Sequence, residues 1–144
     1  MKDQSLHKDT GKAFLGRGWK FPVRFKKSHK GVEMSQYEQD IRESLNILLS
    51  TDIGERVMRR NYGTNIRALL FEPLDVSTGT LVGEEIKKAI LLHEPRVFVD
   101  AVKVVQEELN GYLEVKIDYT IIATNTRSNL VYPFYLNEGT NIQQ

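Results

Sequence analysis

The pattern of hydrophobic positions changes once along the chain. Between residues 35 and 93, apolar side chains recur at spacings of three and four, which is typical of amphipathic helices with one core-facing side. After Arg96 the spacing becomes two, which is typical of strands. The sequence therefore predicts an α+β fold, in which N-terminal helices pack on a small, mainly antiparallel C-terminal sheet with an open edge.

The first expected helix begins at Ser35. Ser35 and Glu38 form a capping-box pattern, in which each side chain bonds to the other residue's backbone N–H, and the helix is expected to end near residues 50–51. Its core-facing residues are expected to be Tyr37, Ile41, Leu45, Leu48 and Leu49.

Two further helices are expected before residue 94. Thr64 can cap a short helix that Pro73 stops, and Ser77 or Thr78 can cap a longer helix that runs to about His93. The longer helix is expected to bury Val82, Ile86, Ala89 and Ile90 and to expose an ion pair between Glu84 and Lys88.

Three strands are expected in the second half. The first covers residues 97–106, and the Asn-Gly turn at residues 110–111 leads into a second strand over residues 112–123. Residues 125–129 are expected to form a loop, and residues 130–136 a third strand whose proline points to a sheet edge.

A two-residue turn at that position also predicts the register of the first strand pair. Val104 then lies opposite Ile117, which satisfies the buried face. Glu107 would oppose Glu114, and Asp100 would lie among apolar residues, so we expect a β-bulge or an end to pairing there.

Composition excludes several classes of protein. The chain has 144 residues, of which 40% are hydrophobic and 27% charged, as expected of one compact domain that needs no crosslink. It has no cysteine, which excludes disulfides, thiol catalysis and thiolate-bound zinc. No apolar run is long enough to span a bilayer and no secretory signal is evident, so we expect synthesis in the cytoplasm.

The formal net charge of +1 is unevenly distributed. Residues 1–34 carry nine basic and three acidic side chains, whereas the rest carry 11 basic and 16 acidic ones. We therefore expect three regions: a basic arm with a short extended segment (1–34), an α+β domain (35–137) and a polar tail (138–144). The arm is either a solvated terminus or a segment that meets a partner.

Aromatic residues alternate within the arm. Trp19, Phe21, Val23 and Phe25 have a period of two, and Pro22 indicates an edge strand or an extended tether. Basic and aromatic residues together can bind single-stranded nucleic acid. Docking of these aromatics on the same domain or on a neighbour is the favoured interpretation, and no nucleic-acid partner is expected.

No enzymatic motif is found. The three histidines, His7, His29 and His93, are scattered, and motifs for nucleotide binding or nucleophilic catalysis are absent, so no metal and no cofactor are expected. Paired carboxylates could hydrolyse glycosides, with Glu55, Glu72 or Glu94 as candidates, but 19 acidic residues always provide such candidates.

Three features point to binding. Proline rigidifies the Glu94-Pro95-Arg96 junction between helix and sheet, which suits bidentate pairing with a partner or, alternatively, an internal salt bridge. The Gly54-Glu55-Arg56 loop has the same ambiguity, with internal packing favoured. The open sheet edge could accept a strand from another protein, unless the segment around Phe21 covers it.

Seven motifs follow one another between roughly residues 14 and 136: Gly18-Trp19-Lys20-Phe21-Pro22, Ile41 with Ser44-Leu45 and Leu48-Leu49-Ser50-Thr51, Gly54-Glu55-Arg56-Val57-Met58, Tyr62-Gly63-Thr64, Leu70-Phe71-Glu72-Pro73, Glu94-Pro95-Arg96 and Asn129-Leu130-Val131-Tyr132-Pro133-Phe134. In this order they resemble the baseplate wedge protein family of contractile phage tails, which includes the type VI secretion subunit TssE and counterparts in contractile injection particles. Injection-particle members are the most similar.

The resemblance implies a non-enzymatic subunit that joins the baseplate to the first sheath ring by strand addition. It implies that Glu94, Pro95 and Arg96 contact the larger wedge proteins, and it makes the last strand, with Leu130, Val131, Tyr132 and Phe134, the candidate edge for sheath subunits. Spike or tube-proximal proteins are a further option for the basic arm. The alternative function is a lysozyme-like peptidoglycan hydrolase, because some family members carry that label.

Overall fold

The computed structural model describes residues 14–69, 75–107 and 111–135 and separates the chain into two compact units, residues 1–45 and 46–144. Each unit is described by itself. The predicted stop of the second helix at Pro73, the turn residue Asn110 and the polar tail lie outside the described residues.

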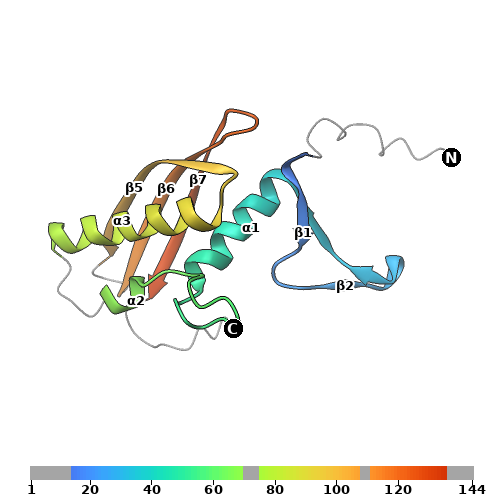
Figure 1. Ribbon diagram of the computed structural model, residues 1–144, viewed down its shortest axis with the longest axis horizontal. Helices are drawn as coiled ribbons and strands as arrows, with labels where there is room; N and C mark the ends of the chain where they lie inside the picture. The colour runs from blue at the N-terminus through green and yellow to red at the C-terminus, as the bar shows by residue number, and fades with distance from the viewer. Residues whose placement is uncertain (1–13, 70–74, 108–110, 136–144) are drawn as a thin grey trace. The chain divides into compact units, whose positions relative to one another are not determined.

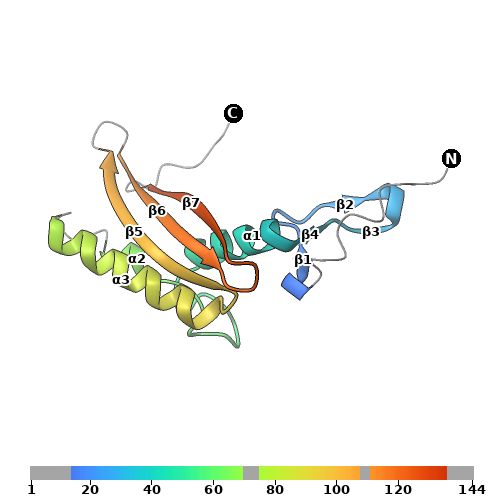
Figure 2. The ribbon, with the colours of Figure 1, turned by 90° about the horizontal axis from the view of Figure 1, so that it is seen from above.

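The C-terminal unit is built on a three-stranded antiparallel sheet with the order β5-β6-β7 (Figure 1). The strands are β5 (Val97–Glu107), β6 (Tyr112–Ile121) and β7 (Thr126–Tyr135). Helix α3 (Val76–His93) lies along the sheet beside β5, and the short helix α2 (Ile66–Leu69) contacts α3 (Figure 2). The α+β prediction is confirmed.

The buried side chains follow the predicted faces. Alternate residues of β6 are buried, as expected of a central strand with one face against a helix. From α3, the four predicted residues Val82, Ile86, Ala89 and Ile90 are all at most 6% exposed. Helix α1 (Tyr37–Ser50) runs from the N-terminal into the C-terminal unit, and its residues Ile41, Leu45, Leu48 and Leu49 are buried as predicted.

The predicted register between β5 and β6 is wrong by two residues. Glu107 pairs with Tyr112, so the connection has four residues, and Val104 faces Val115 where Ile117 was expected. The shift by two keeps the same side chains inward and removes the predicted opposition of Glu107 and Glu114. The expected irregularity at Asp100 is confirmed as a β-bulge between Val99 and Ala101.

The predicted loop at residues 125–129 is also wrong. Strand β7 begins at Thr126 and pairs with β6 along its whole length, and the turn is confined to residues 122–125, with Asn125 in the left-handed region at φ 51°. Asparagine tolerates this conformation, so a tight turn replaces the longer loop.

Several predicted local interactions take another form. Ser35 does not cap α1, because it pairs with Gly18 in a strand and its buried hydroxyl has no hydrogen-bond partner. The buried hydroxyl of Thr64 likewise caps nothing. Asp75 caps α3, where its side chain accepts from the Thr78 N–H at 2.8 Å, so neither predicted residue is the cap. Glu84 pairs with Lys87, not with Lys88.

The N-terminal unit contains a two-stranded hairpin. Strand β1 (Arg17–Trp19) pairs with β4 (Met34–Gln36), and β2 (Phe25–Lys26) pairs with β3 (Gly31–Val32). A short 3-10 helix, Lys27–His29, connects β2 and β3. Residues 17–19 and 25–26 of the expected extended segment lie in these strands, with a bend at residues 21–22 between them. Its four apolar residues are exposed: Trp19, Phe21, Val23 and Phe25 retain 47–77% of their accessible surface.

Candidate interaction surfaces

The junction between α3 and β5 has the rigid form that its proline predicts. Helix α3 ends at His93, and the Glu94 N–H donates to the Ile90 carbonyl at 2.8 Å as the last bond of the helix. Glu94 then leaves the helical region (φ −130°, ψ 80°), as expected of a residue before proline. Pro95 is exposed at the surface of this turn.

Glu94 and Arg96 form a bidentate salt bridge with each other. Arg96 Nε lies 2.6 Å from Glu94 Oε1, and Arg96 Nη2 lies 2.7 Å from Glu94 Oε2. Glu94 is only 3% exposed, whereas the Arg96 side chain retains 30% of its accessible surface. The internal salt bridge, one of the two sequence interpretations, is therefore formed. Pro95 and part of the Arg96 side chain remain exposed.

The loop between α1 and α2 is closed by hydrogen bonds of its own. Thr64 donates its N–H to the Thr51 carbonyl at 2.9 Å, and the Glu55 carboxylate accepts from the Asp52 N–H at 2.9 Å. Gly63 has φ 124°, and a Cβ there would lie 2.5 Å from the Thr51 carbonyl oxygen, so only glycine fits. The loop between α1 and α2 is therefore an ordered structure, as its two glycines suggested.

The same loop packs against the end of α3 through aromatic rings. The Arg56 guanidinium lies 4.3 Å from the centroid of the Tyr62 ring, and the Tyr62 and His93 rings lie 5.0 Å apart. His93 Nε2 is 2.9 Å from the Asn61 carbonyl oxygen. Burial raises the pKa of the Tyr62 hydroxyl, and the nearby Arg56 charge opposes this shift. Sequence periodicity could not reveal this stack, because its members come from separate segments.

Among the described strands of the sheet, β5 and β7 each pair on one side only. Of the predicted edge residues in β7, Leu130 and Phe134 are buried at 6% exposure, whereas Val131 is 50% exposed. Tyr132 is half-buried, and burial raises its pKa despite a hydrogen bond with Ser50. Leu130 and Phe134 thus belong to the core and can offer a partner only their backbone.

Pro133 indicates which backbone N–H groups of β7 point away from β6. Proline has no N–H to give to the ladder, and alternate residues of an antiparallel strand direct their N–H groups to the same side. We therefore expect the N–H groups of Val131 and Tyr135 to point to the open edge together with the proline nitrogen.

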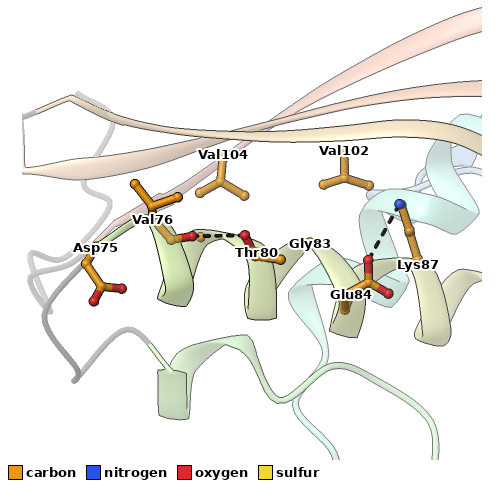
Figure 3. A pocket seen from close by; sticks show the side chains of 9 residues that line it. Asp75, Val76, Thr80, Gly83, Glu84, Lys87, Val102 and Val104 are labelled. Atoms are coloured by element: carbon orange, nitrogen blue, oxygen red, sulfur yellow. Dashed lines mark hydrogen bonds and ion pairs between the residues drawn. The ribbon is translucent and has the colours of Figure 1, made fainter.

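Two shallow grooves lie on the C-terminal unit. One, of about 550 Å³, lies between α3 and β5, with Gly79 and Gly83 on the helix and Val102 and Val104 on the strand (Figure 3). The other, of about 640 Å³, is lined by Asp100, Asp118 and residues 127–129. Both aspartates are exposed, and Asp100 accepts a hydrogen bond from Thr120 at 2.6 Å.

Within the described residues, the predicted catalytic carboxylates do not come together in one site. Glu55 is engaged in its own loop and Glu94 in its salt bridge, while Glu72 lies outside the described residues. No group of three metal-ligating side chains occurs within the described ranges. No helix found there is long and apolar enough to cross a membrane.

Comparison with known structures gives two informative neighbours. A Geobacter sulfurreducens protein designated a candidate tail lysozyme is 43% identical, with a TM-score of 0.68 over 73% of this chain and 96% of that one. A chain of the anti-feeding prophage baseplate is 26% identical, with a TM-score of 0.64 over 90% of this chain and 92% of that one. The second match is too long for residues 46–144 alone, so it extends into the N-terminal unit.

A more distant neighbour shares the fold. A chain of the type VI secretion baseplate complex is 16% identical, with a TM-score of 0.53 over 65% of this chain and 88% of that one. No curated protein is similar in sequence. The family model of the baseplate wedge protein gp25 matches residues 35–126, which is more than half of the chain. The chain therefore belongs to the gp25 family of baseplate wedge proteins, structural components of contractile injection systems.

Proposed function

We propose that this protein is a non-enzymatic wedge subunit that joins the baseplate to the first sheath ring. Two observations carry the proposal: the family match over residues 35–126, and a sheet in which, among the strands that the structure describes, β5 and β7 each pair on one side only. An open edge offers a row of backbone donors and acceptors, so an extended segment of another protein can extend the sheet.

The strand β7 is the proposed edge for the sheath. Val131 is half-exposed, and its N–H group is expected on the open side. Leu130, Tyr132 and Phe134 hold the strand against the unit's interior, which keeps the edge in place when it is pulled. Several main-chain hydrogen bonds in such a joint would have to break together under a force along the strands.

The Glu94-Pro95-Arg96 junction is the proposed contact for the larger wedge proteins. Glu94 acts within the chain by fixing the Arg96 guanidinium, and the exposed Pro95 and the remaining exposed part of Arg96 provide the contact. An arginine held at two points loses little conformational freedom when a partner covers its exposed part.

The basic hairpin of the N-terminal unit is proposed to contact spike or tube-proximal proteins. Glu33 lies within ion-pair distance of Lys20 and Lys26, while the exposed Arg24 and Lys30 form no ion pair with described residues. The match to the anti-feeding prophage chain extends into this unit, which supports a role for the hairpin within such particles.

Two surface substitutions separate the two proposed contacts of the C-terminal unit. Pro95→Asp places a charge on the exposed turn and should prevent incorporation into wedges, while sheath attachment sites stay intact. Val131→Pro removes one edge N–H and should prevent sheath polymerisation on assembled baseplates, whereas Val131→Thr, which keeps the N–H, should not. Normal sheath growth on Val131→Pro baseplates would contradict the strand joint.

A peptidoglycan hydrolase is the second candidate, because the 43% identical neighbour is designated a candidate tail lysozyme. Two pairs of described carboxylates each line one groove, Asp75 with Glu84 and Asp100 with Asp118. Asp75 caps α3, so Asp100 and Asp118 are the pair to test. Clearing of a peptidoglycan suspension by the purified protein, abolished by Asp118→Asn and not by Glu85→Gln, would replace the structural proposal. Absence of clearing is the expected result.

A further inference from the structure

Two large apolar side chains stand almost entirely in solvent at the loop between α1 and α2. Val57 is 89% exposed and Met58 is 95% exposed. Single exposed apolar residues are ordinary on protein surfaces, whereas these two are adjacent in one loop and together form an apolar surface that a partner can cover.

The loop that carries them has a fixed shape. The Gly54 N–H donates to the Arg60 carbonyl at 2.8 Å, which closes residues 54–60 into a compact loop that we call the tip loop. Met58 adopts the left-handed region at φ 65°, which is unfavourable for a side chain of this size. Such a conformation persists only where the surrounding structure imposes it, and it occurs often at binding sites. The side chains of Val57 and Met58 are thus presented by a preorganised backbone, which lowers the entropic cost of binding.

The tip loop is strongly basic. Arg56, Arg59 and Arg60 flank the apolar pair, all three are exposed, and none forms an ion pair with the described residues. Glu55 is the one acidic residue in the loop, and its carboxylate accepts a hydrogen bond from the Asp52 N–H. Charge complementarity therefore favours an acidic surface around whatever receives Val57 and Met58.

A chain of direct contacts connects the tip loop to the Glu94-Pro95-Arg96 junction. Arg56 lies on the Tyr62 ring, and Tyr62 lies on His93, the residue before Glu94. The two sites therefore belong to the same region of the C-terminal unit, and a protein that binds the junction can also reach the tip loop.

We propose that the tip loop is a second contact for the wedge partner, in which Val57 and Met58 enter an apolar pocket with an acidic rim. The inference rests on the proposed wedge contact and deepens it, because it assigns the apolar anchors of an interface whose junction residues are polar. Buried anchors of this kind carry most of the affinity of a protein interface.

The absence of cysteine provides a direct test. Met58→Cys creates a single thiol whose maleimide labelling can be followed in the free protein and in purified baseplates. We expect labelling to be at least about tenfold slower in baseplates, because a hot-spot side chain is shielded from solvent. Equal labelling rates in baseplates that contain the protein would overturn the tip-loop proposal, whereas absence of the protein from baseplates would contradict the wedge function itself.

A pair of matched variants tests the energetic role. Val57→Ser/Met58→Ser should lower incorporation into wedges by about tenfold or more, while Val76→Ser, at a valine 89% exposed at the start of α3, should change it by less than about twofold. Both variants should melt within about 3 °C of the parent, since the substituted residues are exposed. Equal incorporation of the two variants would overturn the proposal.

Membranes and nucleic acid are the other possible occupants, because both attract arginine. The purified protein should bind neither phosphatidylcholine–phosphatidylserine vesicles nor a single-stranded oligonucleotide through the tip loop. Binding of either that disappears in Val57→Ser/Met58→Ser would overturn the assignment to a protein partner.

Discussion

The two antiparallel structures of this chain place their apolar residues in opposite ways. In the C-terminal sheet, Val115, Ile117 and Tyr119 of β6 are at most 1% exposed. In the N-terminal hairpin, Trp19 is 64% and Phe25 is 77% exposed. Both have strand-forming sequences, so the difference lies in the second layer: α3 covers the sheet, whereas the hairpin has only two paired strands at any point.

This contrast suggests that the sheet determines the stability of the fold and that the hairpin serves interactions with other proteins. A helix-covered sheet stabilises itself through buried apolar area, whereas an isolated two-stranded hairpin is marginal in water. We therefore expect substitutions in the sheet to act on folding, and substitutions in the hairpin to act on assembly. Four sets of variants test this expectation.

The largest expected effect is Ile117→Ala in the sheet. Ile117 is fully buried, and its truncation should lower the free energy of unfolding by about 3–4 kcal/mol through lost burial and a residual cavity. Phe25→Ala, which removes a larger but exposed side chain, should change it by less than about 0.5 kcal/mol. Urea denaturation measures both, and equal losses would remove the distinction between sheet and hairpin.

Arg96→Ala should cost about 3 kcal/mol, because it leaves the buried Glu94 carboxylate without its cation. Adding Glu94→Gln should restore much of the loss, since a neutral side chain replaces the unpaired charge. Lys20→Ala in the hairpin removes a more exposed ion pair and should cost less. Thermal denaturation of the variants measures all three effects, and the absence of recovery in the double variant would show that packing, not charge, dominates at the junction.

Two glycine substitutions compare a site enclosed by backbone atoms with a site next to a side chain that can move. Gly63→Ala should cost about 2 kcal/mol, because the new Cβ meets backbone atoms at a positive φ. Gly18→Ala in the hairpin meets the Asp40 carboxylate oxygen, the end of a side chain that can rotate away, and should cost less. Melting temperatures of the two variants provide the comparison, and a larger loss at Gly18 would show that the hairpin is the more tightly determined part.

The smallest expected effect is a pH dependence in the hairpin. Hydrogen bonds from Lys20 and Lys26 lower the pKa of Glu33 from its usual 4.5. A carboxylate with a lowered folded-state pKa stabilises the fold above its unfolded pKa, and this stabilisation is lost as the pH falls through the folded value. Trp19 fluorescence from pH 7 to pH 3 should show this transition, and Glu33→Gln should abolish it.

The sequence was most informative where a pattern extends over many residues. The buried faces of α1 and α3 and the alternation of β6 follow from periodicity alone, because each face repeats at least four times. The end of α3 before Pro95 follows from the geometry of proline, which no tertiary contact can override.

Local signals were less reliable where a tertiary partner competed. Ser35 matches a capping box, yet strand pairing with Gly18 takes it out of the cap, and α1 begins two residues later. The Asn-Gly turn suggested a two-residue connection, whereas four residues separate Glu107 from Tyr112. The observed register removes the opposition of Glu107 and Glu114 but places Lys103 opposite Lys116, so cross-strand charge alone does not determine it.

The site was only partly predictable for a related reason. The Glu94-Arg96 bridge joins residues two apart, so the motif alone suggested it. The Arg56-Tyr62-His93 stack joins residues up to 37 apart, which places it beyond any local pattern. Val57 and Met58 lie in a segment that has neither helical nor strand periodicity, so no buried face could be assigned to them. Their position between arginines is the sequence feature that indicates an exposed loop.

The order β5-β6-β7 has a consequence for how the protein is made. Each strand pairs with its neighbour along the chain, and the turn between β6 and β7 is confined to residues 122–125. Nearby pairings close with little loss of chain entropy, so such a meander is expected to form rapidly, without waiting for distant segments. Folding of this sheet is thus expected to finish before assembly begins, and each subunit can arrive at the growing particle with its strand edges already in place.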